Sequence, residues 1–120
     1  MATGTISEPK NVYSTSNEVP IGTWIDGKTI YRKVMYWGAM PNNTTVTKNH
    51  NIANIDYIVQ VCGISKNNNS TPPNCQNIPT ANSNSAYCCA LWANKNHIGM
   101  KTGDDRSYQT AYVWIEYTKT

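Results

Sequence analysis

The pair Asp26-Gly27 constrains the fold most, because it lies between two runs of residues that favour β-strands. Such a pair favours a hairpin, since a type I′ turn needs positive φ at both central positions and these residues reach it at low cost. The run that follows has the two-residue period of a strand. Its two faces carry Ile30, Arg32, Val34 and Tyr36, and Thr29, Tyr31, Lys33, Met35 and Trp37. The sequence therefore predicts a β-hairpin whose second strand spans residues 29–37.

The rest of the chain predicts further short strands and no helix, because no segment keeps a 3.6-residue period. Turn-forming residues separate the apolar and β-branched runs. The predicted strands cover residues 45–50, 55–64, 86–93, 98–102 and 110–119. Short strands separated by turns in this way are typical of an all-β fold, an antiparallel β-sandwich or barrel-like domain.

The middle of the chain is predicted to hold one core strand followed by one long loop. Strict alternation over 55–64 would place Ile55, Tyr57, Val59 and Val61 on a single face. Residues 65–85 contain Asn67-Asn68-Asn69, Pro72-Pro73 and Pro79, which interrupt every strand pattern. We therefore expect a loop there, of a length that is usually functional or disordered.

The last predicted strand is apolar on both faces. Ala111, Val113, Ile115 and Tyr117 form the expected inner face. The other face carries Tyr112 and Trp114, where a solvent-facing strand would be polar. This face should therefore be covered, either by an identical subunit or by another part of the same chain.

Length and composition restrict the number of domains and the classes of partner. At 120 residues, the chain predicts one domain that a partner subunit would stabilise. We interpret residues 1–20 as an N-terminal extended segment or linker and 21–120 as the all-β domain. The net charge of +3 is scattered, which argues against a nucleic-acid partner. The sequence predicts neither membrane insertion nor a signal peptide, because it has no long apolar run and no basic n-region.

The cysteines and histidines lack the spacing of a metal site. The candidate ligands are Cys62, Cys75, Cys88, Cys89, His50 and His97. Structural zinc usually takes two pairs of ligands, each pair a few residues apart. We therefore predict no metal and no cofactor. Cys88 and Cys89 are neighbours in a predicted strand, so one should point inward as a small apolar residue.

No pattern of acids, thiols or histidines favours catalysis. Asp56 and Glu116 could form a carboxylate pair of the kind that glycosidases use, but both are read more simply as exposed or salt-bridged strand residues. Cys88 or Cys89 with His97 could imitate a thiol nucleophile and its base, but only their proximity on neighbouring predicted strands suggests this pair. We therefore predict that the protein is not an enzyme.

The run Asp104-Asp105-Arg106-Ser107 is interpreted as a turn before the last strand. In that interpretation an aspartate caps backbone amides and Arg106 pairs with a carboxylate. A binding role for this dense polar run is the alternative.

The order and spacing of several stretches resemble a known family. They are Gly22-Thr23-Trp24-Ile25-Asp26-Gly27-Lys28 and its continuation to residue 33, preceded by 12–15 and Glu18, and the later stretches 54–59, 102–107 and 111–120. Together they resemble the C-terminal receptor-binding tip domain of phage and prophage tail-fibre proteins.

The resemblance implies a homotrimer at the distal end of a tail fibre in the virion, made in the cytoplasm of the bacterial host. It also implies a receptor-binding domain for host attachment. Together with the residue analysis, we interpret this domain as non-catalytic and expect it to recognise a bacterial cell-surface polysaccharide. One alternative is a structural trimerisation cap without receptor contact. A remote alternative is a fragment of a polysaccharide depolymerase.

Aromatic and amide side chains are the candidate ligand-binding residues, because an aromatic ring covers the apolar face of a sugar while amides take its hydroxyl groups. The candidates are Trp92, Tyr87, Asn94, Asn96 and Trp37. The competing interpretation places most of these aromatic residues in the core or at a subunit interface. We expect one or two of them to bind the ligand.

Overall fold

The computed structural model describes residues 11–69, 74–81, 83–84 and 88–120, and these residues form strands, turns and no helix. The eight strands are β1 (Val19–Thr23), β2 (Thr29–Ala39), β3 (Thr45–Asn49), β4 (Ile55–Asn67), β5 (Asn74–Ile78), β6 (Cys89–Ala93), β7 (His97–Thr102) and β8 (Gln109–Lys119). The predicted all-β fold class is thus confirmed. β2, β3, β4, β7 and β8 match predicted strands closely, and β6 lies within the predicted strand 86–93, whose first two residues fall outside the described ranges.

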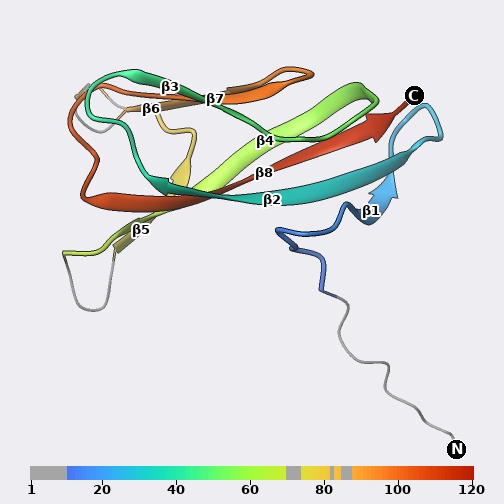
Figure 1. The fold of residues 1–120 in the computed structure, drawn as a ribbon, viewed down its shortest axis with the longest axis horizontal. Helices are drawn as coiled ribbons and strands as arrows, with labels where there is room; N and C mark the ends of the chain where they lie inside the picture. Colours follow the sequence, from blue (N-terminus) through green and yellow to red (C-terminus); the bar gives the residue numbers. More distant parts are fainter. Residues whose placement is uncertain (1–10, 70–73, 82, 85–87) are drawn as a thin grey trace, which may run out of the picture.

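The described strands form two antiparallel sheets. A five-stranded sheet has the order β1-β2-β8-β4-β5, and a three-stranded sheet has the order β3-β7-β6. The three-stranded sheet covers one face of the larger sheet, so that the two resemble part of a barrel (Figure 1). This arrangement confirms the predicted sandwich or barrel-like architecture at the level of the single chain.

The core lies between the two sheets, with β8 at its centre. The inner face predicted for the last strand is confirmed, because all four of its side chains are buried. The rest of the core comes from β2, β4, β5, β6, β7 and the segments that connect them: Trp37, Met40, Ile52, Ile55, Ile78, Cys89, Ile98 and Met100. Cys89 is therefore the inward-pointing member of the cysteine pair.

The predicted hairpin between β1 and β2 is present, but its turn differs from the type I′ prediction. The Gly27 amide donates to the Trp24 carbonyl at 3.0 Å, and the Trp24 amide donates to the Lys28 carbonyl at 2.8 Å. Within this described turn Gly27 alone has positive φ, at 89°. This pattern is that of a three-residue loop with a bulged glycine. Asp26 instead accepts a hydrogen bond from the Lys28 amide through Oδ1 at 2.9 Å.

The strict alternation predicted for residues 55–64 was wrong. The pairing of β4 with β8 shifts register between Ile55 and Tyr57 and again between Ile58 and Gln60. Each shift reverses the side-chain alternation, because a bulge adds one residue to one strand. As a result Ile58 packs against the core, whereas the predicted core residue Tyr57 is exposed.

The predicted long loop over 65–85 was also partly wrong. β4 continues to Asn67, and β5 pairs with it from Asn74 to Ile78. Ser65 and Ile78 are both buried. Residues 70–73, 82 and 85 of the predicted loop lie outside the described residues.

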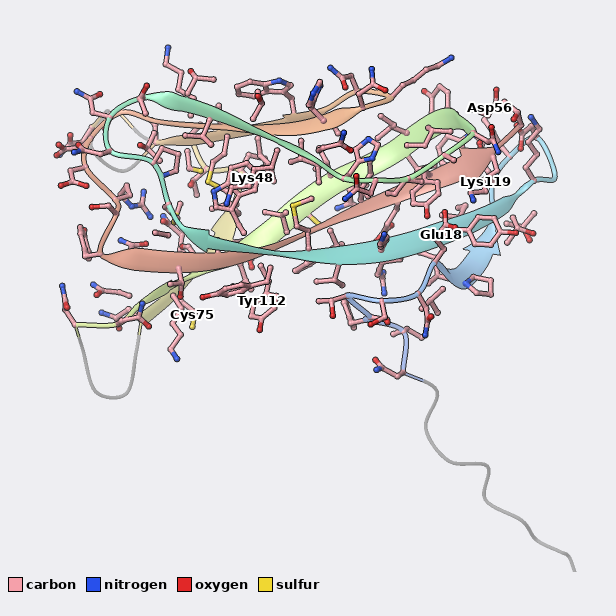
Figure 2. All side chains as sticks on the ribbon, in the orientation of Figure 1. Glu18, Lys48, Asp56, Cys75, Tyr112 and Lys119 are labelled. Carbon is pink, nitrogen blue, oxygen red and sulfur yellow. The ribbon has the colours of Figure 1, made fainter. Side chains whose placement is uncertain are left out.

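Residues 11–18 run along the face of the five-stranded sheet that turns away from the core (Figure 1). The Val34 amide donates to the Ser14 carbonyl at 2.9 Å. The Tyr13 ring meets the Trp114 ring edge-on, with 5.4 Å between centroids. Part of the same chain therefore covers Trp114, whereas Tyr112 on that face keeps 47% of its surface exposed. Figure 2 shows Tyr112 on the side away from the three-stranded sheet.

Candidate functional site

Trp92 lies across Gly99 of the neighbouring strand. β6 and β7 pair so that the two residues stand opposite each other. A Cβ atom placed on Gly99 would lie 2.2 to 2.5 Å from three atoms of the indole. The indole thus occupies the space where a side chain of residue 99 would stand, while 39% of the Trp92 surface is exposed. The result is a flat aromatic surface supported by backbone and open to solvent.

The strand period places Trp92 on the side of the three-stranded sheet that turns away from the core. Ile98 and Met100 of β7 are buried, so His97, Gly99 and Lys101 point the other way. We call this side the outer face. Across the pairing register it carries Thr45, Thr47, Asn49, Ala90, Trp92, His97, Gly99 and Lys101. Figure 2 shows side chains along this sheet projecting away from the five-stranded sheet.

Asn94 holds the β6–β7 turn together. Its Oδ1 accepts hydrogen bonds from the backbone amides of Asn96 and His97, both at 2.8 Å. The backbone amide of Asn94 donates to the His97 carbonyl at 2.9 Å. The side-chain oxygen of Asn94 is thus used within the turn. The Asn94 and Asn96 side chains are exposed at the tip of the hairpin, beside the outer face.

Buried His50 fixes this hairpin tip to the segment after β3. The Ile52 amide donates to His50 Nδ1 at 3.1 Å, so Nδ1 is the acceptor nitrogen. The other ring nitrogen, Nε2, lies 2.8 Å from the Asn94 carbonyl and must be the donor. The His50 amide also donates to the Asn96 carbonyl at 3.2 Å. The turn beside Trp92 therefore has a fixed position relative to the core.

One of the predicted ligand-binding residues, Trp37, does not contribute to this surface. Trp37 is 1% exposed and belongs to the core. The Lys48 ammonium lies 4.8 Å from the centre of the Trp37 ring and donates to the Trp37 carbonyl. Trp37 has no open ring face in this arrangement, so we leave it out of the candidate site. Tyr87 lies outside the described residues.

Sequence reasoning missed Thr47, His97 and Lys101. The alternation of residues 97–102 could have placed His97 and Lys101 on one face. Their position beside Trp92, however, depends on the pairing of β6 with β7, and that of Thr47 depends on the pairing of β3 with β7.

The turn predicted at residues 104–107 is present, but Arg106 differs from its prediction. Asp105 Oδ1 accepts hydrogen bonds from the hydroxyl and the amide of Ser107, at 2.6 and 2.9 Å, which lower the pKa of Asp105. Arg106 is buried and pairs with no carboxylate among the described residues. Its Nη2 donates to the amide oxygens of Gln76 and Gln109, both at 2.9 Å. These partners come from β5 and β8, which the local sequence around Arg106 does not reveal.

The candidate catalytic carboxylates are each held in an ion pair. Asp56 lies 2.7 Å from Lys28 Nζ, and Glu116 lies 2.8 Å from Arg32 Nη2. The salt-bridged reading of both acids is therefore confirmed. Within the described ranges, no group of three or more His, Cys, Asp and Glu side chains could hold a metal ion.

A groove of about 480 Å³ lies on the opposite side of the molecule, between residues 11–16 and the five-stranded sheet. Tyr13, Ile64, Tyr112 and Trp114 are among its lining residues. Beside the groove the rings of Tyr36 and Tyr112, both exposed, stand 4.9 Å apart. This second surface is more aromatic than the outer face.

Comparisons with protein-family models, curated proteins and solved structures gave no match to this chain. In the part of the chain that the structure describes, no helix has the length and apolar character needed to cross a membrane.

Proposed function

We propose that this domain is the receptor-binding tip of a phage or prophage tail fibre and attaches to a bacterial surface polysaccharide without catalysis. The observation that carries the proposal is the exposed Trp92 ring lying on Gly99 in the middle of a polar sheet face. A flat aromatic ring can stack on the apolar face of a pyranose, and neighbouring hydroxyl and amide groups can bond its hydroxyls. The sequence resemblance to tail-fibre tips supports the same conclusion.

The shallow geometry of the outer face favours a multivalent protein. A single site of this kind binds with about 4 kcal/mol, a millimolar affinity. Several sites on one rigid body raise the avidity by about two to four powers of ten if a repetitive polymer reaches them together. We therefore include a homotrimer in the proposal, with the Tyr36 and Tyr112 surface as its subunit contact. The expected location is the distal end of the fibre in the virion.

A second candidate function is a trimerisation cap that closes the fibre without touching the receptor. The exposed Tyr36 and Tyr112 rings, with the groove beside them, favour this reading, because large exposed aromatic patches often mark protein contacts. We do not propose the depolymerase alternative, because Asp56 and Glu116 are engaged in ion pairs.

Binding of the purified domain to a panel of bacterial strains tests the proposal. The parent should bind at least one strain, and Trp92→Ala should abolish this binding. Tyr108→Ala is the matched control, because Tyr108 is exposed to a similar degree, 44%, and lies in the turn before β8, a strand of the other sheet. Both variants should melt within a few degrees of the parent.

Two results would reject the assignment. If Trp92→Ala folds and binds cells like the parent, the indole is not the receptor contact. If the parent binds no strain while forming a stable trimer, the trimerisation cap becomes the better description.

A further inference from the structure

The three-stranded sheet has an unusual balance of charge. β3, β6 and β7 contain no aspartate or glutamate, and their ionisable side chains other than cysteine are Lys48, His97 and Lys101. Lys48 bonds the Trp37 carbonyl. His97 and Lys101 both stand on the outer face, two residues to either side of Gly99. They therefore flank the indole that covers Gly99.

Neither of these two basic side chains is engaged within the described part of the chain. No hydrogen bond or ion pair of the Lys101 ammonium or of the His97 ring is formed there. Lysines elsewhere have clear structural partners, since Lys28 pairs with Asp56 and Lys119 pairs with Glu18. Lys101 is thus placed to meet a group from outside the chain.

The acids nearest along the chain are in the turn after β7. Asp105 accepts two hydrogen bonds from Ser107, and Asp104 Oδ1 accepts one from the Asp105 amide at 2.8 Å. Both carboxylates thus have local partners within the turn. Between Trp92 and Lys101, the outer face presents a ring for stacking and a cation for a negative charge.

We propose that the receptor is an acidic polysaccharide, an inference that rests on the proposed function. The carboxylate is carried by the sugar that stacks on Trp92 or by the next sugar of the polymer. Lys101 is the main contact for this carboxylate, and His97 lies on the other side of the ring. Diagonal neighbours on one face of a sheet are about 7–8 Å apart, a distance that a substituent of a stacked pyranose and the flexible stem of lysine can bridge together. Thr47 and Asn49 line the same face and can take hydroxyl groups.

The test uses polysaccharide purified from a strain that the domain binds, before and after reduction of its carboxyl groups to hydroxymethyl groups. The reduced polymer keeps the sugar rings and loses the charges. The parent should bind the native polymer at least tenfold more tightly than the reduced polymer, because only the native polymer can form the charge-assisted hydrogen bond with Lys101. This preference should weaken as sodium chloride rises, because the contact is exposed.

Lys101→Gln is the decisive variant, and Lys66→Gln is its matched control. Lys66 is also an exposed strand lysine, but it belongs to β4 in the other sheet, and its replacement changes the net charge equally. Lys101→Gln should lose about tenfold in affinity for the native polymer and little for the reduced one. Lys66→Gln should behave like the parent.

The outcomes separate this inference from the proposed function. Equal binding of native and reduced polymer, with Trp92→Ala inactive, overturns the acidic receptor and leaves the aromatic site in place. Equal losses for Lys101→Gln and Lys66→Gln overturn the assignment of Lys101, because they indicate unspecific attraction. If no strain is bound, the proposed function fails and the acidic receptor fails with it.

Discussion

The hydroxyl of Tyr117 donates a hydrogen bond to the carboxylate of Glu18, which joins the last strand to the segment before β1. Lys119 Nζ lies 2.9 Å from the same carboxylate, and Figure 2 shows Glu18 and Lys119 at the same end of the sheet. Further along the segment, the Arg32 guanidinium lies 4.4 Å from the centre of the Tyr13 ring. Residues 11–18 are thus attached to the sheet at both ends.

The Glu18 attachment predicts a dependence of stability on pH. Burial raises the pKa of Glu18, but the hydrogen bond from Tyr117 and the pairing with Lys119 outweigh it and leave this pKa below its usual 4.5. A carboxylate with a lowered folded-state pKa stabilises the protein above its unfolded-state pKa, and the stabilisation is lost as pH falls through the folded-state value. The free energy of unfolding should therefore decrease below about pH 4.5, as measured by urea denaturation.

Glu18→Gln separates this contribution from those of Asp56 and Asp105. The hydrogen bond from Lys28 lowers the pKa of Asp56, and the Ser107 hydroxyl lowers that of Asp105, so both acids act in the same direction. Glu18→Gln should be less stable than the parent at pH 7 and should lose less stability on acidification. Identical pH profiles for the two proteins would show that Glu18 contributes nothing.

Gly99→Ala should displace the Trp92 ring, because the added methyl group would lie 2.2 Å from the nearest indole atom. We expect weaker cell binding and a loss of roughly 1–3 kcal/mol in the free energy of unfolding. A cell-binding assay and urea denaturation measure these two effects, and tryptophan fluorescence reports the displacement of the ring. Gly22→Ala is the control, because no described atom beyond the two neighbouring residues in the chain lies within 4 Å of its added methyl group. In the background of Trp92→Ala, Gly99→Ala should be nearly neutral, and additive losses would contradict the described packing.

Gly27→Val should lower the melting temperature by several degrees. Residue 27 has a φ of 89°, which a β-branched side chain tolerates poorly, although there is open space around it. Gly27→Asn is the control, because asparagine adopts this region more readily. If both variants have the same melting temperature as the parent, the turn does not depend on the positive φ of residue 27.

Tyr112→Asp tests the proposed trimer better than a change at Trp114. Trp114 packs against Tyr13 of the same chain, so Trp114→Asp would also damage the single subunit. Tyr112 is half exposed within one chain, and an aspartate there should dissociate the trimer with little loss of secondary structure. Light scattering and circular dichroism measure the two properties, with Thr47→Asp on the outer face as the control. A monomeric parent would remove the trimer from the proposal.

The two-residue alternation of side chains and the residues typical of turns were enough to predict much of the fold. The alternation in β8 identified its buried face, and Asp26-Gly27 located the first hairpin. The bulges of β4 could not be predicted, because they appear only in its register with β8. β5 was missed because its residues, Asn74–Ile78, are mostly polar and pair with β4 at the sheet edge through backbone groups.

In the candidate site, too, local sequence predicts some features and the pairing of distant strands determines the others. Trp92 was chosen as a candidate from its residue type and its amide neighbours, and its role in binding stays a prediction. The support that Gly99 gives it, and the basic residues beside it, depend on strand pairing. The Arg106 prediction failed for a related reason, because its partner Gln76 is 30 residues away in the sequence.

The packing of Trp92 on Gly99 has a consequence for how related sequences would vary. A glycine that stays constant in a family is commonly attributed to a turn or to positive φ, but Gly99 lies within a strand and has neither. Its small size matters because of the residue opposite. Positions 92 and 99 should therefore covary: tryptophan at one should accompany glycine at the other, and relatives with a small residue at 92 should accept larger residues at 99.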